Sequence, residues 1–554
     1  MDDTDLLAAG AGIKQTDSSA EEENEIVLSP NTNALLESLR HIKPRATPDE
    51  LSKLTVSQTV SLLAIAYEKI RNAVEYREDH LVLRAAIERI LKRRLALNPG
   101  GIGEAENLLR ELTWARYFPN ESLGDSDIDT VQNIINKYLK IKLNLLDAKK
   151  KETQIYLFQF IFDLLTCEIE ENLNPDSALK SSIFTYFIFQ TLKEKIKVEG
   201  LADEKKDAFF LVALDKAYIK SDSPYLRYHL FSTFYQPLSK ADERNTDKLV
   251  PDLPEIFKKI DSMISNPYVD SLTKFVKKQL PPFLILFSLL VKKRREAAEI
   301  LKSKKNLWQN VESICSEKYK EIGNRLRNLA IRSLIYIFIT KMILALILEY
   351  PTSLFIYGEV SKLSIAINTL FPPILMLVIV LFFKLPTEEN TKNIFKRIVD
   401  IIDLNPIFET HISFLRKKSA PKKEILAFIF TVVYTLTFFF TFYLLNLMLS
   451  FLNFNLISKL IFVFFISVIS FFAYRLKTVT NEYKLREKES VLTPIFDFFF
   501  IPVLAAGKFF SKELGRLNIF IVIFDFIIEA PFKLIIEIFE EWIKFVRARK
   551  EEIV

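Results

Sequence analysis

Lys341 is the residue whose type and position could carry chemistry, because it lies inside an otherwise apolar run. Residues 331–351 read IRSLIYIFITKMILALILEYP, so the ammonium group falls near the middle of a segment long enough to cross a bilayer. Ionisable residues inside a membrane are costly, and they commonly mark solute or proton pathways or paired charges. A transport role and a structural pin between helices are therefore the two roles open to Lys341.

A neighbouring apolar segment offers partners for this cation. The consecutive prolines of LFPPIL lack the backbone N–H groups that would occupy the carbonyls of Asn368 and Thr369. We expect those carbonyls, or the Asn368 side chain, to accept hydrogen bonds from Lys341, with Glu359 in the outer connection as the alternative partner. Lys341, Asn368 and Thr369 thus form a predicted intramembrane polar cluster. A pin is favoured over transport, because the sequence offers no chain of acids or histidines to relay protons.

Catalytic and cofactor motifs are absent from the sequence. The chain contains no H-E-x-x-H, Cys-x-x-Cys, G-x-S-x-G or G-x-x-x-x-G-K-[ST] motif. No pair has metal-ligand spacing among the four histidines, which are His41, His80, His229 and His411. We therefore expect no enzyme activity, no cofactor and no metal site. Cys167 and Cys315 match no redox spacing either, and we expect them to be free thiols.

Composition divides the chain into two parts that must position these residues. The 554 residues exceed what one hydrophobic core usually supports, and 49% of them are hydrophobic, including 48 Phe. Apolar residues crowd into the region after about residue 320, whereas charge dominates before it. Residues 1–48 are acidic and polar, which predicts a disordered tail rather than a secretory signal. The net charge of +6 is too small to indicate nucleic acid as a partner.

Helical spacing dominates residues 49–320. Only 11 glycines occur in the whole chain, and alternating strand patterns are missing, so we predict an all-α fold with a cytosolic helical domain over this range. The clearest helix covers 61–97, where Glu88 lies four residues from both Arg84 and Lys92. Further helices are expected at about 105–117, 127–148, 151–172, 176–198, 203–219, 225–236, 252–264 and 293–328. The run PPFLILFSLLV at 281–291 is too short to span, so a buried helix is favoured over a membrane-surface segment.

The region 321–475 is predicted to be a transmembrane region. Its four apolar segments, each able to cross roughly 30 Å at about 1.5 Å per residue, are 329–349, 363–385, 425–448 and 456–474. Basic residues gather in 384–424 and 475–488, whereas 350–362 and 449–459 hold one Lys each. The positive-inside rule then predicts two hairpins, with both chain termini and the 384–424 loop in the cytoplasm.

The region 476–554 holds no further clear span. Residues 491–507 are apolar but include two prolines and Asp497, so we expect an interfacial or re-entrant segment. From 518 to 547 polar residues recur at helical intervals, which predicts an amphipathic helix on the membrane surface with Trp542 as an interface anchor. Insertion of both segments, which would give six spans, is the alternative.

A basic cluster lies in the loop between the two hairpins. It retains that loop in the cytoplasm, and it could also attract anionic lipid headgroups, which contribute roughly 1 kcal/mol per residue near the surface. The candidate lipid contacts are Arg416, Lys417, Lys418, Lys422 and Lys423.

One segment resembles a known group of sequences. Residues 67–95, YEKIRNAVEYREDHLVLRAAIERILKRRL, resemble a stretch in uncharacterised helical membrane proteins of bacteria with very small genomes, the candidate phyla group. That family has no assigned activity. The resemblance therefore implies a bacterial cytoplasmic membrane and no site residues.

These observations predict an integral membrane protein. The favoured function is a non-enzymatic anchor or scaffold that presents the helical domain to a protein or lipid partner. A transporter or channel subunit is the first alternative, and a polar cavity around Lys341 would favour it. A lipid-modifying enzyme is the second, and it would need polar groups converging at the cytosolic interface, for example around Asp497.

Overall fold

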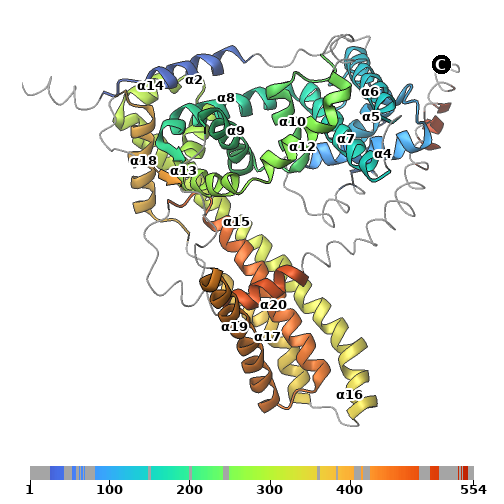
Figure 1. Cartoon of the computed structure of the whole chain (residues 1–554), viewed down its shortest axis with the longest axis vertical. Coiled ribbons are helices and arrows are strands. Elements are labelled where there is room, and N and C mark those ends of the chain that lie inside the picture. The colour runs from blue at the N-terminus through green and yellow to red at the C-terminus, as the bar shows by residue number, and fades with distance from the viewer. Residues whose placement is uncertain are drawn as a thin grey trace, which may run out of the picture. The chain divides into compact units, whose positions relative to one another are not determined.

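Helical spacing in the sequence becomes helix in almost every described segment (Figure 1). The computed structural model describes residues 25–42, 53–57, 81–146, 151–198, 202–240, 249–357, 362–381, 385–404, 413–415, 424–485 and 500–510, with separate residues between 61 and 68 and between 535 and 549. The all-α prediction is confirmed for this part of the chain. The Arg416–Lys423 cluster, Glu359, Asp497 and residues 511–534 lie outside the described residues.

The chain divides into two compact units. Unit 1 comprises Met1–Asn33, Lys278–His411 and Arg416–Asn518, and unit 2 comprises Ala34–Lys277, Ile412–Leu415 and Ile519–Val554. This division differs from the expected domain boundary near residue 320, because 278–320 belongs to the unit that holds the apolar helices.

Unit 2 is an array of helices around a central one. Its longer helices are α4 (Val82–Leu97), α5 (Glu104–Trp114), α6 (Asp125–Leu146), α7 (Lys151–Leu173), α8 (Pro175–Leu192), α9 (Asp203–Leu214), α10 (Ser223–Phe234) and α12 (Leu253–Ile264). Helix α7 packs against α4, α6, α8, α10 and α12. Its sequence IYLFQFIFDLLTCEIE is apolar on most sides, as a helix surrounded by others requires.

Local contacts in the turns and caps define the ends of several of these helices. The turn after α4 places Gly101 at φ +68°, with the Leu139 side chain so close that a Cβ atom at Gly101 would meet it. Asp222 caps the start of α10, because its side chain accepts a hydrogen bond from the Tyr225 backbone N–H. The predicted ion pairs on α4 are present, at 2.9 Å from Arg84 to Glu88 and 2.6 Å from Lys92 to Glu88.

Unit 2 also contains elements that are not α-helical, among them the 3-10 helices η3 (Lys193–Lys195) and η5 (Val250–Asp252). Residues Ile196–Val198 (β1) pair in parallel with Ser413–Leu415 (β2), with Ile196 opposite Ser413. A π-helical turn, Asp215–Ile219, ends α9.

Unit 1 is built on one long helix. Helix α15 (Lys304–Leu344) has 41 residues and continues through a π-helical turn, η6 (Ala345–Glu349), into α16 (Tyr350–Tyr357). The other helices are α13 (Pro267–Lys292, which starts in unit 2), α14 (Ala297–Lys302), α17 (Lys362–Leu381), α18 (Glu388–Ile402), α19 (Glu424–Phe451), α20 (Leu456–Thr480) and a helix over 500–510. Helix α17 packs against both α15 and α20, and α19 packs against α20 (Figure 1).

Three helices of the described part are long and apolar enough to cross a membrane. They are Lys304–Phe355, Phe428–Phe451 and Leu456–Ala473. Two shorter apolar helices accompany them, Ile365–Leu381 and Phe500–Phe510. The expected second span thus corresponds to the helix α17.

The amino-terminal region differs from the expected disordered tail over residues 25–42. Residues 30–41 form α2 (Pro30–His41), and the segment before it bonds to unit 1. The Ile26 N–H donates to the Lys302 carbonyl at 2.7 Å, and the Leu404 N–H donates to the Val27 carbonyl at 2.8 Å. Burial of Ile26 and Leu28 explains why this short acidic region is ordered.

Two smaller expectations are confirmed. The run 281–291 lies inside α13, and Phe283, Ile285 and Leu286 on it are buried, as a core helix requires. Cys167 and Cys315 are free and buried.

Candidate functional site

The continuous helix α15–η6–α16 places Lys341 and Glu349 on one face. Two regular α-helical turns hold about 7.2 residues, so side chains eight positions apart would be rotated away from each other. The π-helical turn Ala345–Glu349 winds more widely and takes up about one extra residue, which brings the two side chains back into line. A local widening of the helix therefore positions this pair.

Lys341 and Glu349 form a fully buried ion pair. Their Nζ and Oε2 atoms are 3.6 Å apart, and both side chains are 0% exposed. The ammonium group also lies 5.0 Å from the centre of the Phe465 ring on α20, within the range of a cation–π interaction. The positive charge that stood out in the sequence is thus compensated inside the helix bundle.

Helices α17 and α20 supply the hydrogen bonds to the carboxylate. The Asn368 Nδ2 donates to Glu349 Oε1 at 2.6 Å, and the Ser458 hydroxyl donates to the same oxygen at 2.6 Å. Asn368 Nδ2 also lies 3.2 Å from the Ser458 carbonyl oxygen. Glu349 therefore joins three helical segments through one oxygen atom.

A second polar contact lies beside the cluster. The Asn455 Nδ2 donates to the Ser353 hydroxyl at 2.6 Å, and Asn455 Oδ1 accepts from the Ser458 backbone N–H at 2.8 Å. This arrangement fixes the first turn of α20 against α16. It also orients Ser458 toward Glu349.

Three atoms of the cluster are buried without a hydrogen-bond partner in the described structure. They are Lys341 Nζ, Glu349 Oε2 and Asn368 Oδ1. At 3.6 Å the Nζ–Oε2 contact is an ion pair but is longer than a hydrogen bond. Glu349 therefore accepts two short hydrogen bonds through Oε1, whereas its Oε2 makes the longer ion-pair contact with Lys341.

The predicted residues are only partly brought together. Lys341 and Asn368 meet through Glu349 rather than directly, since Lys341 Nζ makes no hydrogen bond among the described residues. Thr369 is half-buried, and Pro372 and Pro373 are buried within α17. The prolines leave the carbonyls of Asn368 and Thr369 without their helical donors, but Lys341 does not donate to them in the described structure.

Sequence reasoning missed Glu349 because it was placed at the outer end of the span. In the structure the helix continues to Tyr357, so Glu349 lies inside it. The signal that could have found it was the continuation of the apolar run as YPTSLFIY, which makes Glu349 an internal residue of the helix.

A second buried polar network lies in unit 2, between α4, α7 and α10. Arg84 is 1% exposed and bonds to Asp222 at 2.5 Å as well as to Glu88. On α7, Glu168 accepts from the Tyr138 hydroxyl at 2.6 Å, and Glu170 accepts from the Tyr225 hydroxyl. These contacts join the central helix to its neighbours.

Burial changes the acidity of this network. Loss of solvent raises the pKa of Glu170 to about 8, with Arg84 opposing and Asp222 adding to the shift. Burial alone would lower the pKa of His229, but the Asp215 carboxylate, 3.1 Å from its Nδ1, outweighs it and the pKa is raised. Both groups therefore hold protons more tightly than they would in water.

Arg227 on α10 adds two further ion pairs to this network. Its guanidinium bonds to Asp163 at 2.7 Å and Asp261 at 2.8 Å, and it lies 4.7 Å from the centre of the Phe160 ring. These contacts join α10 to α7 and α12. Among the described residues, no group of three or more His, Cys, Asp or Glu side chains could hold a metal ion.

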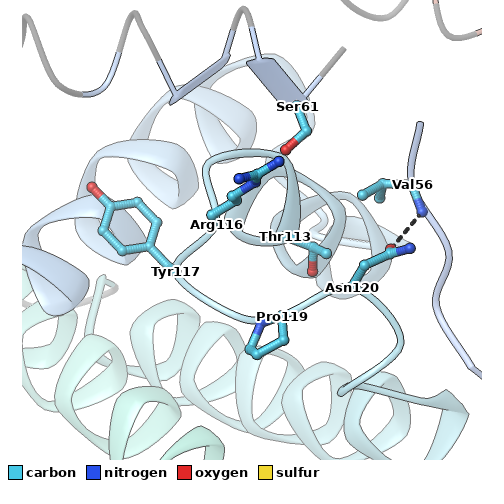
Figure 2. A pocket seen from close by; sticks show the side chains of 7 residues that line it. All are labelled: Val56, Ser61, Thr113, Arg116, Tyr117, Pro119 and Asn120. Atoms are coloured by element: carbon cyan, nitrogen blue, oxygen red, sulfur yellow. Dashed lines mark hydrogen bonds between the residues drawn. The ribbon is translucent and has the colours of Figure 1, made fainter. Parts of the chain in front are cut away.

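Unit 2 also contains a cavity of about 590 Å³ beside the end of α5 (Figure 2). Its lining residues are Val56, Ser61, Thr113, Arg116, Tyr117, Pro119 and Asn120. The Val56 N–H donates to Asn120 Oδ1 at 2.9 Å, which fixes the segment 53–57 over the α5–α6 connection. Ser61 donates to the Trp114 carbonyl at 2.9 Å and closes another side.

Arg116 gives this cavity its charge. It has φ +58°, a backbone conformation that is costly for a residue with a side chain, and it is exposed. Figure 2 shows its guanidinium extending toward Ser61, whereas the Tyr117 ring points away. The Tyr117 hydroxyl donates to Glu68 at 3.1 Å. The cavity can therefore receive a side chain or small group with an acceptor for Arg116.

The chain matches no known family model, no curated protein sequence and no solved structure.

Proposed function

We propose that this chain is a non-enzymatic scaffold of a bacterial cytoplasmic membrane, which presents its helical unit 2 to a protein partner. Four spans in two hairpins anchor it, with 329–349, 363–385, 425–448 and 456–474 crossing the bilayer and both termini in the cytoplasm. The basic residues between the hairpins contact lipid headgroups. The bacterial source rests on the resemblance of residues 67–95.

The observation that carries this proposal is the closed Lys341–Glu349 pair. Each charge has its counter-charge within the bundle, and Asn368 and Ser458 hold the carboxylate from two further helices. Removing one member of a buried pair usually costs about 3–5 kcal/mol, so the pair resists rearrangement. A bundle fixed in this way suits an anchor.

Helix α18 ties α15 to the segment that follows α20 in unit 1. Asn390 on α18 donates to the Tyr319 hydroxyl on α15 at 2.8 Å and to the Tyr483 carbonyl at 2.9 Å, while its Oδ1 accepts from the Leu485 N–H at 2.9 Å. Helix α15 runs about 60 Å at about 1.5 Å per residue, longer than the roughly 30 Å of a bilayer core. Unit 1 thus supports a rigid platform that extends beyond the membrane.

The cavity beside Arg116 is the place on unit 2 where we expect the partner to bind. A photocrosslinking amino acid at Pro119, an exposed residue of the cavity lining, should capture one protein in cells, and the same substitution at the exposed Glu204 on α9 is the matched control. The captured protein should copurify with the wild-type chain and be lost with Arg116→Glu, since that change reverses the one charge among the described residues that line the cavity. Equal capture at both positions, or copurification that survives Arg116→Glu, would contradict a partner at this cavity.

A transporter or channel subunit is the second candidate, favoured by one observation. The π-helical turn lies directly between Lys341 and Glu349, and π turns are frequent at functional sites. Proteoliposomes decide between the two functions. The scaffold requires that cation and proton uptake match that of empty liposomes, whereas uptake that disappears in Lys341→Met would establish transport.

A further inference from the structure

The described residues near the carboxy terminus form one exposed apolar face of a helix. Ile535, Ile538, Phe539, Trp542, Phe545 and Val546 are helical, and each is between 45% and 62% exposed. Their spacing of three and four residues places all six on one side. We call these six residues the carboxy-terminal stripe.

Another side of the same helix is seated on unit 2. Ile543 packs against the buried Ala64 and Trp114, together with Val56. Because neighbouring residues in a helix are rotated by about 100°, a helix held by Ile543 turns Trp542 toward solvent. The stripe is therefore presented by the body of unit 2.

We propose that the carboxy-terminal stripe docks on the surface of a bilayer that contains anionic lipid. Three of its six residues are aromatic, and Trp and Phe on an amphipathic helix favour the boundary between headgroups and acyl chains. Cations follow in the sequence at Arg547, Arg549 and Lys550, and the Arg549 guanidinium lies 5.6 Å from the Phe545 ring centre. Residues 535–554 also hold five Glu, so the match to an anionic membrane surface is local to the end of the stripe where Arg549 lies.

The stripe fits a bilayer better than a second copy of the chain. Its residues fill a broad face, whereas the seam of a two-stranded coil is narrower and prefers Leu, Ile and Val. The chain also carries helices apolar enough to cross a membrane, so a tethered bilayer surface is present at high effective concentration. The inference rests on the proposed function in one respect, namely that the apolar helices of the chain cross a membrane.

Site-specific fluorescence tests the docking in the full chain. A polarity-sensitive nitrobenzoxadiazole label is placed at Ile538→Cys, and at Glu541→Cys as the control, since Glu541 is exposed on the same helix but outside the stripe. The native Cys167 and Cys315 are buried, which keeps background labelling low. The protein is reconstituted in vesicles of phosphatidylcholine with phosphatidylglycerol, with nitroxide-labelled lipid as the quencher.

Docking requires that the label at Ile538 shift to the blue and be quenched several-fold more than the label at Glu541. The difference should shrink in vesicles of phosphatidylcholine alone. Equal quenching at the two positions would overturn the proposal. So would a blue shift without lipid quenching, combined with a disulfide between two copies at Ile538→Cys, which would identify a second copy as the occupant.

A third label separates this proposal from the membrane function itself. Phe439 on α19 is 68% exposed, and Phe439→Cys should be quenched strongly if unit 1 spans the bilayer. Loss of quenching at Phe439 would contradict the proposed function. Loss at Ile538 alone would contradict only the docking of the stripe.

Discussion

At the scale of single residues, Glu349 is what makes a lysine tolerable inside the bundle. Glu349→Gln keeps the shape of the side chain and an oxygen that can accept from Asn368 and Ser458, so it removes little except the charge. We expect it to destabilise the protein by about 3–5 kcal/mol, because Lys341 is left buried without a counter-charge. Thermal unfolding in detergent, followed by size-exclusion chromatography, measures the loss.

The double variant Lys341→Met/Glu349→Gln is the matched control for this prediction. It removes both charges and should be clearly more stable than Glu349→Gln alone, since no unpaired charge stays buried. A single variant as stable as the wild type would show that the pair does not hold the bundle.

Glu170 gives unit 2 a pH dependence of defined sign. Its carboxyl keeps a proton up to a pKa of about 8 in the folded protein, against 4.5 when unfolded, because burial disfavours the charged form. Between these values the folded state binds more protons, so the free energy of unfolding falls as pH rises. The raised pKa of His229 acts in the same direction.

We therefore expect unit 2 to be more stable at pH 6 than at pH 8, with a slope for Glu170 of at most about 1.4 kcal/mol per pH unit. Denaturant unfolding followed by Trp114 fluorescence, with Trp308 and Trp542 changed to Phe, reports on this unit. Glu170→Gln should reduce the slope, and Glu204→Gln on the exposed side of α9 is the control. A wild-type stability that rises over this interval would contradict the assignment.

At the scale of elements, the helix over 500–510 depends on a close approach to α20. A Cβ atom at Gly507 would lie 2.0 Å from the Ser467 carbonyl oxygen, so no larger residue fits without moving the helix. Ser467 is itself 0% exposed, as expected where two helices pack through small residues. Gly507→Ala should therefore separate these helices.

Chemical crosslinking measures that separation. The ring centres of Phe464 and Phe510 are 5.1 Å apart, so a short bifunctional maleimide should join cysteines placed at both positions. The yield should fall several-fold with Gly507→Ala and stay unchanged with Lys508→Ala, which alters an exposed neighbour. An unchanged yield in Gly507→Ala would mean that the helix does not pack at this position.

Helix spacing predicted the elements well but not their internal irregularities. Expected helices at 105–117 and 127–148 are found as Glu104–Trp114 and Asp125–Leu146, since apolar periodicity reports directly on which face is buried. The π turn Ala345–Glu349 could not be read in this way. It follows from contacts of Glu349 with residues on α17 and α20, which periodicity along one helix does not record.

At the scale of the whole molecule, two sets of hydrogen bonds lie at opposite ends of the apolar bundle in unit 1. Asn455 bonds to Ser353 near the α19–α20 turn, and Asn390 joins Tyr319 to Tyr483 at the other end of α20. Basic residues gather in the sequence beside Asn390 and Tyr483, while the Asn455 end has few charges. The positive-inside rule therefore predicts that the Asn455 end lies outside the cell.

Labelling from each side of the membrane tests that orientation. Phe451 is 87% exposed at the end of α19, and Lys392 lies on α18 with a side chain 57% exposed. Phe451→Cys should react with an impermeant maleimide in intact cells, and Lys392→Cys should react only after the membrane is opened. Because Cys167 and Cys315 are buried, the wild-type chain provides the background. The reverse pattern would invert the topology and place the helical unit on the outer side, where a cytoplasmic partner could not reach the cavity beside Arg116.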